Sequence, residues 1–188
     1  MATTRPDRLH FTGNDEADEL LAREPFALLI GFALDQQVPV QTAFAGPLKL
    51  KQRFGTLEPA EIAVAGPARL DEVFREKPAI HRFPGNMARR VQDLAAVVAE
   101  DYGGDAERVW SGAADGADLR KRISALPGFG EMKVKALSAV LAKRFGVEAA
   151  KEIAPSHPTL GDVDSAEALE EYQAKKRAHK ASMRAAKA

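Results

Sequence analysis

The most informative segment of the chain is Leu126-Pro127-Gly128-Phe129-Gly130. It joins two stretches of helix-forming residues, 118–125 and 131–145. Glycines let the backbone turn tightly there, because they carry no Cβ that would clash. The pattern therefore predicts a hairpin of two helices joined by a glycine-rich turn.

This predicted turn leaves backbone N–H groups without partners. The first turn of a helix has no hydrogen-bond acceptors for its own N–H groups, and such groups form a cradle for a phosphate. Lys133 and Lys135 follow the turn and add positive charge, which Glu131 partly cancels. A phosphate contact of this kind binds DNA without reading its sequence. The alternative is a plain connection between two helices.

Outward from the hairpin, the composition favours helices throughout. The chain of 188 residues is 45% hydrophobic and 6% aromatic, and Ala, Leu, Glu, Lys and Arg recur along it. We expect an all-α fold with one compact domain, residues 1–165, followed by a charged C-terminal helix or tail, residues 166–188. Further helices are expected at residues 15–23, 26–34, 40–54, 59–64, 67–74, 87–102 and 106–110. The almost wholly apolar segment 26–34 predicts a buried central helix.

Charge and residue usage exclude several classes of protein. With 27 basic and 27 acidic residues the net charge is zero, so any site for DNA must be a local patch. The chain has no cysteine, which excludes disulfides and a cysteine-bound iron–sulfur cluster, and its 4 histidines lack metal-ligand spacing. We therefore expect no metal and no cofactor. With no apolar run of about 20 residues and no signal-peptide pattern, we expect no membrane contact and a cytoplasmic location beside the nucleoid. The oligomeric state stays open.

The hairpin sequence resembles that of the helix-hairpin-helix (HhH-GPD) superfamily of DNA glycosylases. Two further segments, residues 34–43 with Asp35-Gln36-Gln37 and residues 89–95, are similar to other parts of that family in the same order. The resemblance covers about residues 26–145 and is greatest to compact bacterial base-excision repair proteins. It implies that the chain binds double-stranded DNA, flips out a damaged base and cleaves its N-glycosidic bond, while a glutamine fills the gap. Gln36 and Gln37 either insert in this way or cap helix ends.

The chain departs from the family at its catalytic aspartate. Residues 147–152, where the family carries it, contain no Asp. The first aspartates beyond the hairpin are Asp162 and Asp164, of which Asp162 is the preferred candidate. Each has a structural alternative, because Asp164 or Ser165 can cap the last helix and Asp162 can belong to a turn.

A second departure concerns the lysine with which some family members cleave the DNA strand. Its position is occupied by Met132, and Lys133 is displaced by one residue, which turns a helical side chain by about 100°. The resemblance therefore implies a monofunctional glycosylase without lyase activity.

The proline-containing loop of residues 78–86 carries two further candidates. In this loop, His81 and Arg82 either contact phosphate or are ordinary surface residues.

Three functions remain open from the sequence. The first is a glycosylase that hydrolyses the N-glycosidic bond with the help of a carboxylate. The second is a non-catalytic protein that binds DNA or a lesion, which the missing aspartate favours. The third is an interaction module whose basic C-terminal helix binds a protein or extends the contact with DNA. The damaged base is not specified by the sequence.

Overall fold

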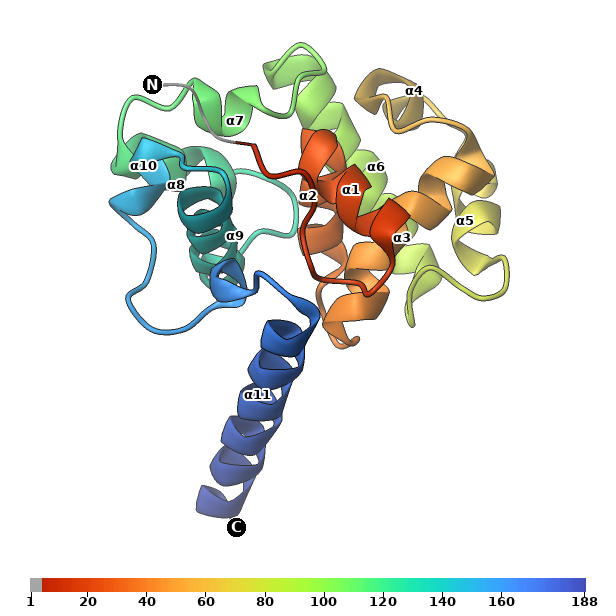
Figure 1. Ribbon diagram of the computed structural model, residues 1–188. Coiled ribbons are helices and arrows are strands. Elements are labelled where there is room, and N and C mark those ends of the chain that lie inside the picture. The colour runs from red at the N-terminus through yellow and green to blue at the C-terminus, as the bar shows by residue number, and fades with distance from the viewer. Residues whose placement is uncertain (1–4) are drawn as a thin grey trace.

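The computed structural model describes residues 5–188, and within that part the chain is entirely helical. It contains eleven α-helices and one 3-10 helix, and no strand occurs among the residues described. This confirms the all-α prediction. Figure 1 shows a compact body from which one long helix projects at the C-terminal end.

Helix α2 (Pro25–Leu34) lies at the centre of the body. Every residue of this helix after Pro25 is buried, as its apolar sequence predicts. It packs against α1 (Asp15–Arg23), α3 (Val40–Phe54) and α6 (Pro84–Asp101). Gly31 brings α2 close to α3, because the Phe44 ring occupies the space that a Cβ at Gly31 would need.

The middle of the chain folds around α6. Helices α4 (Pro59–Ala63) and α5 (Pro67–Arg75) both pack on it, and Gly55 ends α3 in a left-handed conformation at φ +101°. Helix α6 begins at Pro84, three residues before the predicted start at residue 87. The segment Phe83-Pro84-Gly85-Asn86 looks like a turn in the sequence, but proline is well suited to the first turn of a helix.

The hairpin helices belong to a second group of elements, seen on the left of Figure 1. These are α7 (Arg108–Ser111), α8 (Gly116–Ser124), α9 (Glu131–Arg144), α10 (Glu148–Lys151) and the 3-10 helix η1 (Leu160–Asp162). Helix α9 packs against α8, α10 and η1. The short elements α10 and η1 were not predicted, because so few residues carry no periodic pattern.

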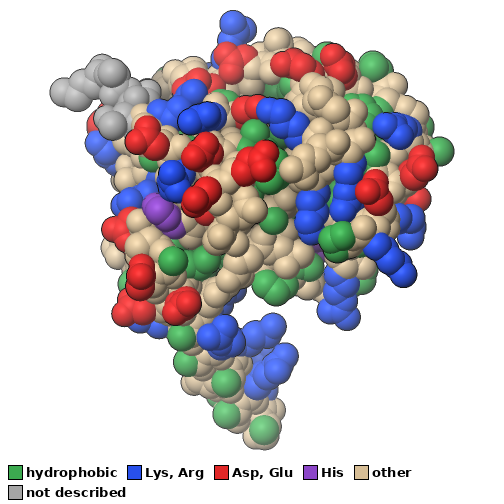
Figure 2. Space-filling model, turned by 45° about the vertical axis from the view of Figure 1, so that its right-hand side comes forward, with side chains coloured by type: hydrophobic (Ala, Val, Ile, Leu, Met, Phe, Trp, Pro, Cys, Tyr) green, Lys and Arg blue, Asp and Glu red, His purple; other side chains and the backbone are tan. Residues whose placement is uncertain are grey.

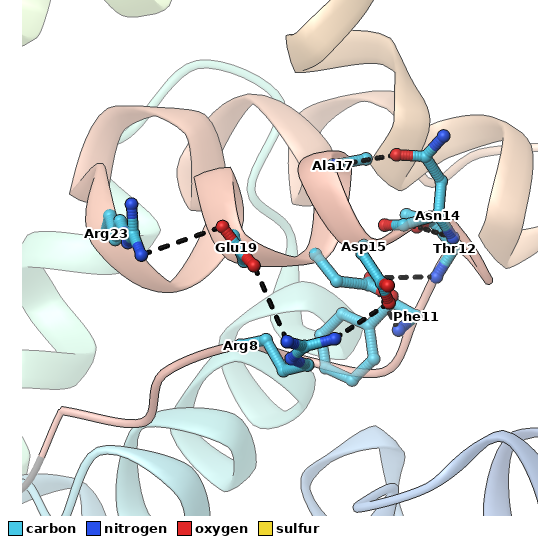
Figure 3. A network of polar contacts seen from close by, with 9 residues as sticks. Arg8, Phe11, Thr12, Asn14, Asp15, Ala17, Glu19 and Arg23 are labelled. Atoms are coloured by element: carbon cyan, nitrogen blue, oxygen red, sulfur yellow. Dashed lines mark hydrogen bonds and ion pairs between the residues drawn. The ribbon is translucent and has the colours of Figure 1, made fainter.

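The N-terminal lead-in is fastened to α1 by polar contacts (Figure 3). Arg8 pairs with Asp15 at 2.8 Å and with Glu19 at 3.5 Å, and Asn14 caps α1 by accepting from Ala17 N. The buried Asp18 carboxylate accepts from the backbone N–H groups of Phe11 and Thr12, each at 3.0 Å. The lead-in therefore closes one side of the core.

Helix α11 (Ala166–Ala186) follows η1 and extends away from the body. Ser165 caps it by accepting from Ala168 N at 3.1 Å, so Ser165 and not Asp164 is the capping residue. Only its first turns touch the body, through the buried Leu169 and the half-buried Tyr172 and Gln173. From Ala174 onward every residue is exposed. No helix in the described part of the chain is both long enough and apolar enough to span a membrane.

Candidate nucleic-acid interface

The hairpin turn depends on one glycine more than on the other. Gly128 has φ +82°, a left-handed conformation that residues with a Cβ rarely adopt. Gly130 has an extended backbone at φ −81° and ψ −178°, and a Cβ there would meet no atom within 4 Å. The expectation that both glycines serve the tight turn is therefore wrong for Gly130. Leu126 and Phe129 are buried and hold the turn to the core.

Several backbone N–H groups of the hairpin are free, as expected. The carbonyl of Gly130 accepts from Lys133 N and Val134 N, each at 3.0 Å, and so begins α9. Among the described residues, no hydrogen-bond acceptor lies within reach of the N–H groups of Gly128, Gly130, Glu131 and Met132. Glu131 forms an ion pair with Arg120, which offsets its negative charge beside these groups.

The Gln36-Gln37 turn follows the end of α2 and is held in place by a buried histidine. His81 Nδ1 accepts from Phe83 N at 2.9 Å, so Nε2 carries the proton and donates to the carbonyls of Leu34 and Gln36 at 3.0 and 3.1 Å. Burial lowers the pKa of His81 and keeps the ring neutral. His81 is only 2% exposed, so it neither contacts phosphate nor lies on the surface.

Gln37 has an unusual backbone. Its φ is +59°, the only positive φ at a non-glycine residue in residues 5–188. Such a conformation is uncommon for residues with a Cβ, and strained residues of this kind cluster at functional sites. The side chains of both glutamines are exposed, and neither caps a helix. The capping alternative for these glutamines is therefore wrong.

Arg90 on α6 connects this turn to the hairpin. Its Nη1 donates to Gln36 Oε1 at 2.6 Å. Its Cδ lies only 2.6 Å from the point that a Cβ on Gly128 would occupy, so the missing side chain of Gly128 makes room for the arginine. Sequence reasoning missed Arg90, although the basic start of residues 89–95 was a signal.

These residues line an open groove of about 630 Å³, which we call the hairpin groove. Its walls are the glutamine turn, the start of α6 and the hairpin, through Gln36, Gln37, Phe83, Asn86, Met87, Arg89, Arg90, Asp93, Pro127 and Gly128. Residues distant in the sequence therefore meet on one surface. Figure 2 shows that Lys and Arg side chains gather locally on the visible face although the net charge is zero.

The two lysines after the hairpin have different positions. Lys133 turns inward, where its ammonium group donates to the carbonyl of Ala33 at 3.1 Å and lies 5.8 Å from the centre of the Phe129 ring. Burial, helped by Arg90, lowers the pKa of Lys133 to about 8. Lys133 therefore bonds to the end of α2 and does not line the hairpin groove. Lys135 is exposed, and Met132 is 81% exposed.

Asp162 has a structural role in the cap of the 3-10 helix η1. Its carboxylate pairs with Lys143 at 2.7 Å and accepts from Thr159 N at 2.7 Å as part of the cap of η1. Burial raises its pKa, but these hydrogen bonds outweigh burial and leave the pKa below the ordinary value. Lys143 is in the last turn of α9, and the hairpin adjoins the first turn. Asp162 and the exposed Asp164 line no groove near the glutamines.

The carboxylate that does lie beside the glutamine turn is Asp35. It is partly buried at the end of α2, and no hydrogen-bond donor or cation reaches its carboxylate in the described part of the chain. Burial raises the pKa of Asp35, while Lys176 and Lys133 act in the opposite direction. Asp35 was missed because nothing in the sequence shows that a residue next to a turn will be unpaired.

Asp35 lines a second groove, of about 560 Å³, which we call the α11 groove. Its walls are the glutamine turn, Arg82 and one side of α11, through Asp35, Gln37, Val38, Pro39, Val40, Arg82, Gln173, Lys176, Arg177 and Lys180. Gln37 therefore stands between the two grooves and lines both.

Compared with models of protein families, with curated protein sequences and with solved structures, the chain has no significant match. No cluster of three or more His, Cys, Asp or Glu side chains that could hold a metal ion occurs among residues 5–188. Evidence on function therefore comes from the residues and their arrangement.

Proposed function

We propose that this protein binds duplex DNA along the hairpin groove and acts in base-excision repair as a monofunctional DNA glycosylase. The observation that carries the proposal is the meeting of Gln36, Arg90 and Gly128 on one surface. A turn with exposed glutamines, an arginine and a cradle of free N–H groups are adjacent there. Together they offer one group that can enter DNA and two that can hold its backbone.

The hairpin and Arg90 supply the contacts with phosphate. The free N–H groups of Gly128, Gly130, Glu131 and Met132 suit the oxygens of one phosphate group, and helix α9 places its positive end behind them. Only one N–H of the Arg90 guanidinium is used by Gln36, and the rest of its fork can receive a neighbouring phosphate. These contacts hold the duplex in register against the glutamine turn.

Gln37 is the group that we assign to the space left by a flipped base. Its strained backbone holds an exposed amide between the two grooves, where it can reach into the base stack. Hydrolysis then requires water to add at the sugar carbon as the base leaves with its bonding electrons and takes up a proton. A carboxylate assists by stabilising the positive charge that develops on the sugar.

We assign this carboxylate to Asp35 in place of Asp162. Asp35 adjoins the glutamine turn and forms no direct ion pair among the described residues, whereas Asp162 is paired with Lys143. The test is single-turnover incubation with duplexes carrying uracil, hypoxanthine, alkylated purines or oxidised bases, followed by alkali. We expect strand breaks that require alkali on at least one duplex, their loss in Asp35→Asn and their retention in Asp162→Asn. Breaks without alkali would contradict a monofunctional enzyme.

The second candidate function is binding of DNA or a lesion without catalysis. It is favoured by one observation, which is that both aspartates suggested by the family pattern lie outside the grooves. In that case no duplex yields breaks, while binding is retained and is weakened by Arg90→Ala and Gly128→Ala. Absence of binding to any duplex would overturn both candidates.

A further inference from the structure

The face of α11 that docks on the body continues outward as a row of positive charges. Leu169, Tyr172 and Gln173 contact the body, and Lys176 and Lys180 follow them at helical spacing on the same side. Arg177, Arg184 and Lys187 add further positive charge after Gln173, whereas the acidic residues of α11 lie in its first turns. The helix therefore carries its positive charge toward the α11 groove.

Contacts in the first half of α11 fix the direction of this charged row. The side-chain amides of Gln41 and Gln173 bond to one another, with Gln41 Nε2 donating at 3.0 Å. The ammonium group of Lys176 lies 5.9 Å from the centre of the Tyr172 ring. The basic side chains are thus held beside the start of α3, although they are themselves exposed. Figure 1 shows the helix leaving the body, and Figure 2 shows Lys and Arg side chains near the point where it emerges.

The α11 groove adjoins the hairpin groove at Gln37, which lines both. Arg82 also lines the α11 groove, so three basic side chains of the helix and one of the loop border the same space. Asp35 is the one acidic residue of that lining, and it is partly buried. A ligand that spans both grooves would pass the glutamine turn with free N–H groups and arginines on one side and the α11 row on the other.

We propose that Lys176, Arg177 and Lys180 of α11 bind the phosphates of duplex DNA on the side of the Gln36-Gln37 turn opposite the hairpin. This inference rests on the proposed binding of DNA in the hairpin groove. Duplex DNA fits because it presents an extended row of phosphates, whereas a small anion would occupy only part of the charged row. The two rows of contacts hold the backbone on both sides of the glutamine turn, where the duplex must be opened for a base to leave.

The test is the salt dependence of binding to a labelled duplex, measured by fluorescence anisotropy on the full chain. Each lost phosphate contact reduces the slope of log K against log salt by about 0.9. We expect the triple variant Lys176→Gln, Arg177→Gln, Lys180→Gln to lose about two to three units of slope and roughly tenfold or more in affinity. The control variant Lys121→Gln, Lys151→Gln, Lys175→Gln removes the same charge from residues outside both grooves, and we expect it to keep the slope.

The outcomes separate this inference from the proposed function. An unchanged slope in the α11 variant, with binding lost in Arg90→Ala, would overturn the role of α11 and leave the hairpin groove as the DNA site. Equal losses in the α11 variant and its control would also overturn it, because bulk charge would then be responsible. If the wild type binds anionic lipid vesicles but no duplex, both proposals are overturned. Circular dichroism of each variant checks that the helices are retained.

Discussion

At the scale of single residues, alanine substitutions at the two hairpin glycines form a matched pair of variants. Gly128→Ala forces a side chain into a left-handed conformation and against Arg90, so we expect the free energy of unfolding to fall by about 1–2 kcal/mol or more. Gly130→Ala adds a methyl group in open space and reduces the freedom of the unfolded chain, so we expect no loss and a gain of up to about 1 kcal/mol. Urea unfolding of both variants measures the difference. Equal losses would show that the turn is not formed as described.

Asp35 gives a prediction on pH. Because its pKa is raised in the folded state, the folded protein binds more protons than the unfolded chain between the ordinary Asp value and the raised one. The stabilisation by the neutral acid is therefore complete below the ordinary Asp pKa and is lost as pH rises through the raised pKa. We expect Asp35→Asn to be more stable than wild type at pH 7 and the gap to close in acid. Thermal unfolding across pH 3–7 tests this, with Asp93→Asn as an exposed control.

At the scale of elements, the contact between α2 and α3 depends on Gly31. An added methyl group would collide with the ring of Phe44, which is fully buried, so the two helices would have to separate. We expect Gly31→Ala to lower the free energy of unfolding by about 1–3 kcal/mol. Gly66→Ala is the control, because a Cβ there meets nothing within 4 Å. Chemical unfolding of both variants checks the prediction, and a neutral Gly31→Ala would contradict the close approach of the helices.

The predicted helices agree with the structure where local signals are strong. The segments 15–23 and 40–54 match α1 and α3, because an acidic first turn begins one and Gly55 ends the other. Helix α6 starts earlier than predicted because Pro84 and Gly85 indicate a turn as readily as a helix start. The elements α10 and η1 are stabilised by packing against α9, which no short stretch of sequence reveals.

At the scale of the whole molecule, the outer part of α11 lies outside the core of the body. No residue beyond Gln173 is buried, so residues 174–188 contribute little to the core. We expect a chain that ends after Gln173 to unfold within about 2 °C of the wild type. Differential scanning calorimetry measures this, and a larger decrease would show that the end of α11 supports the body. The truncated chain keeps Leu169 and Tyr172, through which α11 contacts the body. A cut after Ser165 would remove both residues and would therefore not isolate the effect of residues 174–188.

Long-range contacts join the two groups of helices into one surface. Lys133 from the hairpin helix donates to Ala33 at the end of α2, and Arg90 from α6 bonds to Gln36 while lying against Gly128. These bonds bring the hairpin to the glutamine turn. Their partners are separated by tens of residues in the chain, so neither residue of a pair carries a local sign of the other.

The helical class, the central apolar helix, most helix boundaries and the turn between α8 and α9 could be predicted from the amino-acid sequence alone. Each of these follows from neighbours along the chain, through periodicity, helix capping and the special conformations of Gly and Pro. The folded structure was needed to show that Arg90 joins the glutamine turn to the hairpin, that Lys133 turns inward, that Asp35 is unpaired and that Asp162 belongs to a cap. The reason is that a side chain's partners and burial depend on which helices pack together, and packing is not encoded in any local stretch.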